Sequence, residues 1–213
     1  MRVRSRVLGL LVVTFSAVWP PTVAHTAPQP AQTERPRSSQ AATRTAATRM
    51  QRPGLPRLGM VTSQLYRGGQ PEYRGFAELK GLGVDLVVNF RNEADEIVRE
   101  RALVEAQAMR YVSIPWRGKD NPKPEQVVEF LDLLRANVDK VVFVHCARGA
   151  ERTGVMIACY RMSTEGWTAE QALTEMEAFG FRRFGFGHLK RFVREFPSLM
   201  RREPFVREPS SRR

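Results

Sequence analysis

A cysteine and an arginine six positions apart are the residues best suited to chemistry in this sequence. Cys146 and Arg152 bound the stretch Cys-Ala-Arg-Gly-Ala-Glu-Arg, and Thr153 and Gly154 follow it. A thiolate is the nucleophilic form of cysteine, and a positive electrostatic field favours it over the thiol. A guanidinium is planar and can hold two oxygens of a tetrahedral oxyanion at once. The pair therefore indicates nucleophilic attack on a phosphate group.

The flanking residues predict a strand before this loop and a helix after it. Residues 141–144 are β-branched and aromatic, which is typical of a buried strand, and residues 155–162 continue without glycine or proline as a buried helix. A helix N-terminus presents unpaired N–H groups and a partial positive charge, so it attracts anions. Loop amides add a concave nest for oxyanions. We therefore expect the loop to bind the phosphate through Ala147, Arg148, Gly149, Ala150 and Glu151.

The longer string HCARGAERTG, from His145 to Gly154, resembles the signature of the cysteine-dependent protein tyrosine phosphatases. Its HCxxGxxRTG form is similar to the dual-specificity-like branch of that superfamily. The upstream string LYRGGQP, residues 65–71, resembles the start of the domain in many members, and Arg91 follows a strand as an arginine commonly does there. The resemblance covers roughly residues 60–200 and implies the compact single-domain fold of these phosphatases.

The resemblance also implies a reaction and a role for each residue. Cys146 would form a cysteinyl-phosphate that water then hydrolyses, with Arg152 and the loop amides on the equatorial oxygens. Thr153 would donate to the sulfur and ease its departure, and His145 would order the loop through a backbone hydrogen bond. We expect no metal and no cofactor, because the histidines show no ligand spacing; they are His25, His145 and His188.

The leaving oxygen needs a proton, so an acid must reach the site from another segment. In the family this acid is an aspartate on a mobile loop before the cysteine. Asp120 lies 26 residues before Cys146, in a loop with glycine and proline, and is our candidate. Asp-Asn-Pro is also a common turn starter. Asp95, Glu96 and Glu151 remain alternatives.

Two arginines outside the loop have open interpretations. Arg67 is most simply a strand-end cation, with a catalytic role as the alternative. Arg91 could approach the site, because open α/β sheets place their sites at the carboxyl ends of strands. It could equally form an ion pair with Glu93 or Asp95.

The alternating patterns predict one α/β domain with a mostly parallel central sheet and helices on both faces. Residues 179–187 are aromatic, basic and glycine-rich; they predict a loop between two helices, and bordering the pocket is the alternative. Strands are expected at 63–67, 84–90, 111–114 and 141–144, and helices at 73–82, 93–108, 127–138, 155–162, 168–179 and 188–200.

The net charge of +12 over 213 residues lies at the ends of the chain. The segments 1–24, 25–58 and 201–213 carry +3, +5 and +3, which leaves +1 for residues 59–200. A nearly neutral domain argues against nucleic-acid binding. The basic ends could still contact anionic surfaces weakly. We expect the protein to act as a monomer.

The ends of the chain also predict its organisation. Residues 1–24 are expected to be a secretory signal, with three arginines before an apolar run too short for a comfortable membrane span. A retained N-terminal anchor is the alternative. Residues 25–58 predict a disordered linker, 59–200 the phosphatase-like domain, and 201–213 a basic disordered tail. The expected location is therefore periplasmic or secreted.

The only cysteines are Cys146 and Cys159. Cys159 would lie ~10 Å further along the helix, beyond the ~7 Å between Cα atoms that a disulfide allows. We expect both thiols to be free.

Two other functions use similar residues. A rhodanese-type sulfurtransferase also places a cysteine in a loop closed by a cation, but the LYRGGQP string and the Arg-Thr-Gly closure fit that class poorly. A non-catalytic phosphate-binding module is disfavoured by intact Cys146, Arg152 and Thr153. We therefore expect a phosphoric monoester hydrolase acting on phosphotyrosine or mixed sites of a phosphorylated protein. Alanines at 147 and 150, in place of lysines, disfavour inositol lipids, whereas Arg148 favours a highly charged phosphoester.

Overall fold

The structure is a computed structural model that describes residues 45–182 and 184–202. The expected signal segment, the linker up to residue 44 and the tail from residue 203 lie outside the described residues.

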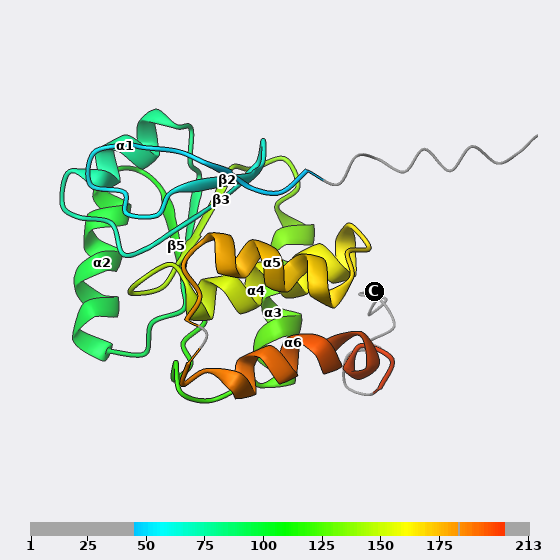
Figure 1. Ribbon diagram of the computed structural model, residues 1–213. Coiled ribbons are helices and arrows are strands. Elements are labelled where there is room, and N and C mark those ends of the chain that lie inside the picture. The colour runs from blue at the N-terminus through cyan, green and yellow to red at the C-terminus, as the bar shows by residue number, and fades with distance from the viewer. Residues whose placement is uncertain (1–44, 183, 203–213) are drawn as a thin grey trace, which may run out of the picture. The chain divides into compact units, whose positions relative to one another are not determined.

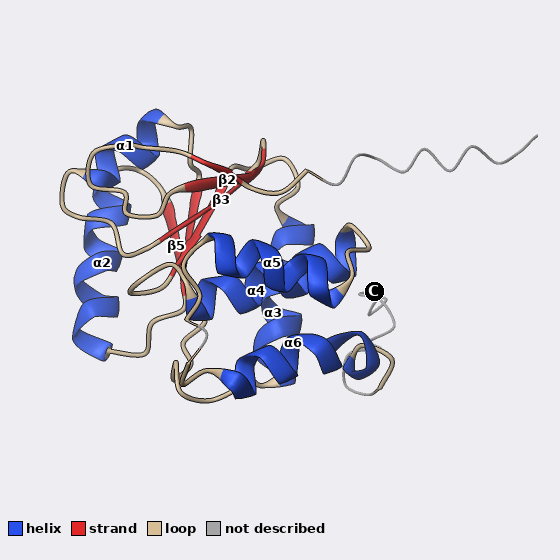
Figure 2. Cartoon of the chain, in the orientation of Figure 1, coloured by secondary structure: helices blue, strands red, loops and turns tan. Residues whose placement is uncertain are grey.

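A six-stranded mixed sheet with helices on both faces forms the domain (Figures 1 and 2). Its strand order is β1-β2-β3-β6-β4-β5; the last four strands are parallel, and β1 and β2 are antiparallel additions at one edge. The predicted α/β class is confirmed. The strands are β1 (Thr48–Arg49), β2 (Gly59–Thr62), β3 (Leu65–Gly68), β4 (Leu86–Asn89), β5 (Arg110–Ser113) and β6 (Val142–His145).

Each strand of the centre faces two apolar cores. In β6, Val142 and Val144 point toward one core and Phe143 toward the other, as the period of two in a strand requires. Figure 1 shows α1 and α2 on one side of the sheet and α3 to α6 on the other. Burial on both faces explains the continuous apolar runs in the sequence. The helices are α1 (Gly75–Gly81), α2 (Ala94–Ala106), α3 (Pro124–Ala136), α4 (Glu151–Thr164), α5 (Ala169–Ala178) and α6 (Gly187–Leu199).

The expectation of a disordered linker through residue 58 is wrong for residues 45–58. Leu55 and Leu58 are buried in the core on the α1 side, and β1 pairs with β2. The backbone of this segment also bonds to the domain: the N–H of Gly69 donates to the carbonyl of Pro56 at 2.8 Å. Two leucines and a short strand pairing anchor a stretch whose average composition indicates disorder. The domain therefore begins before residue 59.

Helix α4 is buried along most of its length, from Glu151 to Cys159. It lies against α3, α5 and α6 in one core. This burial fixes the helix that follows the cysteine loop, and hence the direction of its N-terminus. None of the helices in the described part of the chain is long and apolar enough to cross a membrane.

Candidate active site

The loop between β6 and α4 holds the cysteine where the sequence predicts it. Cys146 directly follows β6, and α4 begins at Glu151. The N–H of Gly149 points at the cysteine and donates to Sγ at 3.2 Å. Cys146 is 2% exposed, yet it lines a pocket, so its sulfur lies at the bottom of a recess. The sulfur of Cys146, the amide of Gly149 and the N-terminus of α4 therefore lie together at this pocket.

The LYRGGQP string supports this loop from outside. Gly149 has φ of +73°, and a Cβ there would lie 2.4 Å from the carbonyl carbon of Gly68. Only glycine suits that position, because other residues avoid positive φ and would collide with the neighbouring strand. The N–H of Gln70 donates to the carbonyl of Ala147 at 3.1 Å. The two strings that carry the family resemblance therefore pack against each other.

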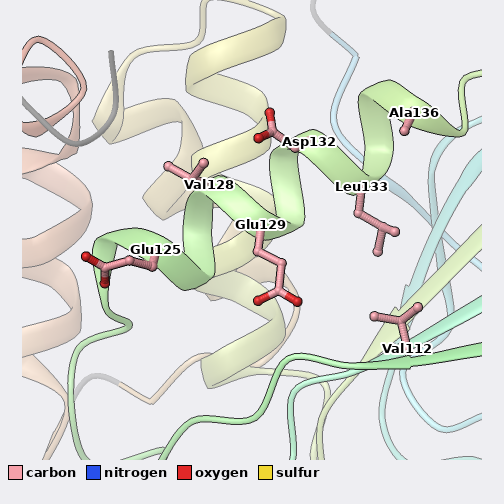
Figure 3. Close-up of a pocket in the computed structure, with 7 residues that line it drawn as sticks. All are labelled: Val112, Glu125, Val128, Glu129, Asp132, Leu133 and Ala136. Carbon is pink, nitrogen blue, oxygen red and sulfur yellow. The ribbon is translucent and has the colours of Figure 1, made fainter. Parts of the chain in front are cut away.

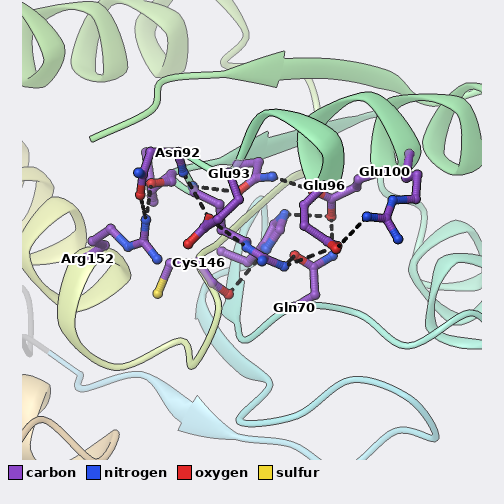
Figure 4. A network of polar contacts seen from close by, with 12 residues as sticks. Gln70, Asn92, Glu93, Glu96, Glu100, Cys146 and Arg152 are labelled. Atoms are coloured by element: carbon purple, nitrogen blue, oxygen red, sulfur yellow. Dashed lines mark hydrogen bonds and ion pairs between the residues drawn. The ribbon is translucent and has the colours of Figure 1, made fainter. Parts of the chain in front are cut away.

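Arg152 reaches the pocket from the first turn of α4. Its Nη1 donates to the carbonyls of Phe90 and Trp116, both at 3.1 Å, and to Oδ1 of Asn92 at 3.0 Å (Figure 4). Among the residues that the structure describes, no hydrogen bond uses its Nε or Nη2. Nη1 thus fixes the side chain, and Nε and Nη2 remain available to donate hydrogen bonds to an oxyanion.

The pocket above the sulfur has a volume of about 250 Å³ and a cationic lining. Four cations and two carboxylates border it among the described residues. They are Lys119, Arg148, Arg152 and Arg182, with Glu93 and Glu151; Asn92, Gly118, Cys146, Ala147 and Phe186 complete the lining. A second hollow, of about 450 Å³, is lined by Glu125, Glu129 and Asp132 of α3 together with apolar residues (Figure 3). Its charge does not suit a phosphate.

A buried polar network lies behind the loop (Figure 4). Glu100 of α2 is 3% exposed, and its oxygens accept hydrogen bonds from the side chains of Gln70, Asn89 and Tyr111. Nε2 of His145 is 2.9 Å from Glu100 Oε1, but the geometry does not make a hydrogen bond. The ring's Nδ1 is 3.4 Å from the carbonyl of Cys146. His145 is fully buried, so its position suits ordering the loop.

One predicted contact, from Thr153, differs from the structure, and one of the two interpretations of Arg91 agrees with it. The hydroxyl of Thr153 is buried and makes no hydrogen bond within the described residues, so the predicted bond from Thr153 to the sulfur is wrong for this structure. Its backbone belongs to the first turn of α4, which directs the side chain into the interior. Arg91 pairs with Glu93 at 3.1 Å and Glu96 at 3.5 Å, as one of its two interpretations expects.

The general-acid candidate lies beside the pocket and does not line it. Asp120 has a side chain that is 60% exposed and pairs with Arg117 at 3.8 Å, although its neighbours Gly118 and Lys119 border the pocket. Glu93 lines the pocket itself. Burial acts to raise the pKa of Glu93, but hydrogen bonds from the backbone and Arg91 outweigh it, and its pKa is lowered. A carboxyl with a lowered pKa is a poor proton donor near neutral pH.

The other acid candidates are paired or distant. Glu151 lines the pocket and accepts from Arg148 at 2.7 Å. Glu96 is engaged with Arg91 and Arg99, and Asp95 lies in the first turn of α2 outside the pocket lining. The assignment of Asp120 therefore stays a prediction.

Two residues of the pocket lining, Asn92 and Glu93, were not predicted from the sequence, whereas residues 179–187 had bordering the pocket as an alternative. Asn92 and Glu93 directly follow Arg91, an arginine typical of the family, and this position alone indicated that they could lie near the pocket. Arg182 and Phe186 come from the loop between α5 and α6, so this stretch both connects helices and borders the pocket. Cys159 is buried and free, like Cys146, and burial raises the pKa of its thiol. No group of three or more His, Cys, Asp or Glu within the described ranges is placed to hold a metal ion.

Comparison with known families agrees with this geometry. The model of the family described as "DSP-PTPase phosphatase fused to NAD+ Kinase" matches residues 59–194, which include the loop, Arg152 and the whole pocket lining. The chain belongs to this family. The match ends within α6, so it covers nearly all of the described domain apart from the N-terminal segment.

Named relatives of the chain are phosphatases. Dual specificity protein phosphatase TpbA of Pseudomonas aeruginosa is 32% identical over 124 residues, which are 58% of this chain and 55% of that protein. The chain thus spans about half the length of the TpbA proteins it matches. Inositol diphosphatase DSP5 of Arabidopsis thaliana is 27% identical over 68% of this chain and 71% of its own length.

Solved structures of phosphatases share the fold of this chain. The crystal structure of P. aeruginosa TpbA is 27% identical, with a TM-score of 0.60 over 77% of this chain and 99% of that chain. The catalytic core of the Saccharomyces cerevisiae phosphatase SIW14 matches at 17% identity and a TM-score of 0.57, over 70% of this chain and 94% of that chain, and shares the fold.

Proposed function

We propose that this protein hydrolyses phosphoric monoesters through a cysteinyl-phosphate. The observation that carries the proposal is the shared recess of Cys146 and Arg152, with an amide aimed at the sulfur and a cationic rim. Preorganised donors of this kind stabilise the charge that develops on a transferring phosphoryl group.

Two displacements describe the reaction. The Cys146 thiolate attacks phosphorus, the P–S bond forms, and the P–O bond to the alcohol or phenol breaks. The leaving oxygen takes the bonding electrons and a proton from an acid. Water then attacks phosphorus and passes a proton to the conjugate base of that acid, the P–S bond breaks with its electrons on sulfur, and the thiolate is regenerated. Arg152 contributes Nε and Nη2 to the equatorial oxygens in both steps.

A metal-free phosphatase assay tests this proposal. The purified protein, with its reduced thiol and in excess chelator, should release phosphate from p-nitrophenyl phosphate, and vanadate should inhibit it. A persulfide on Cys146 after thiosulfate treatment, without phosphate release, would instead identify a sulfurtransferase. Tight phosphopeptide binding without turnover would identify a phosphate-binding module.

The substrate we propose is a phosphorylated protein, with phosphotyrosine or mixed sites. TpbA is named as a dual specificity phosphatase, and a TpbA variant has been solved in complex with pTyr. A second class, inositol diphosphates, is favoured by the rim cations Lys119, Arg148 and Arg182 and by the name of the A. thaliana relative. Phosphate release from phosphotyrosine peptides, phosphoserine peptides and inositol diphosphates, measured as kcat/KM, ranks these classes.

Asp120 and Glu93 give different expectations as proton donors. We expect Asp120→Asn to lower kcat for an alkyl phosphate by about 10²-fold, the scale of general acid catalysis. An aryl phosphate with a good leaving group should lose less. Glu93→Gln is the matched control, because it also removes a carboxyl near the pocket, and we expect a change below about fivefold. The measurement is the alkaline limb of the kcat–pH profile in each variant, because a required general acid loses its proton there. A profile unchanged by Asp120→Asn would remove Asp120 from this role.

We also propose export of the protein from the cytoplasm, with residues 1–24 as the signal. The support is the pattern of these residues alone: arginines, a short apolar run and a proline break. Fractionation of cells that produce the full chain, followed by N-terminal sequencing, tests cleavage against retention.

A further inference from the structure

An arginine from the LYRGGQP string lies beneath the catalytic loop. Arg67 is in β3, beside Val144 of β6, and is 0% exposed. Its Nη2 donates to the carbonyl of Gly149 at 3.2 Å and would lie 3.7 Å from a Cβ placed on Gly154. The guanidinium therefore occupies the space between the loop and the first turn of α4. It is absent from the pocket lining, so it does not reach the substrate.

This guanidinium is poorly paired for a buried cation. Glu175 is its acidic neighbour, at 3.7 Å, which is too long for a hydrogen bond. Nε and Nη1 have no hydrogen-bond partner within the described residues. The ring of Phe179 lies 4.2 Å from the guanidinium carbon. Burial lowers the pKa of Arg67 to about 10, so the group stays charged at neutral pH.

Arg161 shows what full pairing looks like in the same cluster. Its Nη1 contacts Glu165 at 2.6 Å, its Nη2 contacts Glu175 at 2.9 Å, and it stacks on Trp167 at 4.4 Å. Glu175 is thus satisfied by Arg161 and by the N–H of Ala47 at 2.8 Å. It does not depend on Arg67. A buried, underpaired charge is costly to stability, so a contribution to folding does not explain Arg67.

This buried cation lies near the nucleophile of the proposed reaction. Arg67 and Cys146 are close enough for their charges to attract. Arg67 also holds the carbonyl of Gly149, the residue whose N–H points at the sulfur. Both effects favour the anion at Sγ, and they act from the side of the loop opposite the pocket.

We propose that Arg67 is a positioning residue whose buried positive charge stabilises the Cys146 thiolate from beneath the loop. The thiolate attacks in the first displacement and leaves in the second, so the same charge assists both. Only the assistance to the two displacements rests on the proposed phosphatase function. The effect on the thiolate does not, because thiolate reactivity can be measured without a substrate.

Alkylation of Cys146 by iodoacetamide at pH 6, followed by mass spectrometry, tests the proposal. We expect Arg67→Met to slow alkylation by about three- to tenfold, since a loss of thiolate is partly offset by the higher intrinsic reactivity of a more basic thiol. The value of kcat for an aryl phosphate should fall at least as much while KM changes little. Arg67→Lys should restore most of the alkylation rate. The thermal midpoint of Arg67→Met should stay at or above that of the parent protein.

Arg161→Lys is the matched control, because it alters a buried arginine that shares Glu175 but does not touch the loop; its alkylation rate should be unchanged. Wild-type alkylation in Arg67→Met, or an equal loss in Arg161→Lys, would overturn the proposal. If Arg67→Met does not fold, Arg67→Gln against Arg67→Lys gives the same comparison of charge. Slower alkylation in a protein without any phosphatase activity would reject the proposed function and leave the role of Arg67 intact.

Discussion

Cys146→Ser is expected to reduce aryl phosphate hydrolysis by on the order of 10⁵-fold, the scale seen when a covalent nucleophile is lost. A serine hydroxyl stays protonated in a site built to favour a sulfur anion, so the first displacement stops. The loop amides and Arg152 remain, and the variant should still bind a phosphopeptide. The measurement is kcat from stopped assays, with peptide affinity by calorimetry.

Cys159 supplies the control for this experiment. It is a second free cysteine, buried in α4, and burial raises the pKa of its thiol. Cys159→Ala should leave a small cavity that lowers stability by about 1 kcal/mol, but should keep kcat within about twofold. Turnover that survives in Cys146→Ser and disappears in Cys159→Ala would refute the assigned nucleophile.

Arg152→Lys is expected to lower kcat by about 10³-fold, between the loss of one oxyanion donor and the loss of an arginine finger. Lysine has a single nitrogen. It cannot donate to the acceptors that hold Arg152 and also present two donors to the phosphoryl oxygens. The loss should appear in kcat more than in KM, because these contacts strengthen as charge develops.

The thermal stability of Arg152→Lys shows whether its loss of kcat comes from the missing guanidinium or from unfolding. The carbonyls of Phe90 and Trp116 and the amide of Asn92 would lose a donor, so a modest fall in thermal midpoint is expected. The Arg161→Lys protein, altered later in the same helix, should show normal kcat. An Arg152→Lys enzyme with kcat near that of the parent would show that the guanidinium does not contact the transition state.

Local patterns were enough to predict the centre of this domain. Val141 to Gly154 carries a strand, a loop and a helix start within one short stretch, so the position of Cys146 relative to Arg152 follows from neighbouring residues alone. The two-faced apolar runs likewise predicted the parallel strands.

Residues that act across the fold were harder to predict. Glu100 is on a helix whose charges alternate with apolar positions, and nothing local distinguishes it from its exposed neighbours, yet tertiary packing buries it against His145. Arg67 has the same difficulty, because the partner that matters, Gly149, is 82 residues away. The edge strands β1 and β2 were missed because they are short, and β1 also lies in a segment whose composition indicates disorder.

The segment before residue 59 has a consequence for how the protein is handled in a cell or a laboratory. The carbonyl of Pro56 accepts a hydrogen bond from the N–H of Gly69, in the LYRGGQP string. Arg57 donates to the carbonyl of Arg148, in the cysteine loop, at 3.0 Å, so this segment contacts both the string and the loop. Removal of a leader ending near residue 24 would leave that brace intact. A protease cut between β1 and β2 would break the chain beside Leu55 and Leu58, so we expect a protein nicked there to lose phosphatase activity.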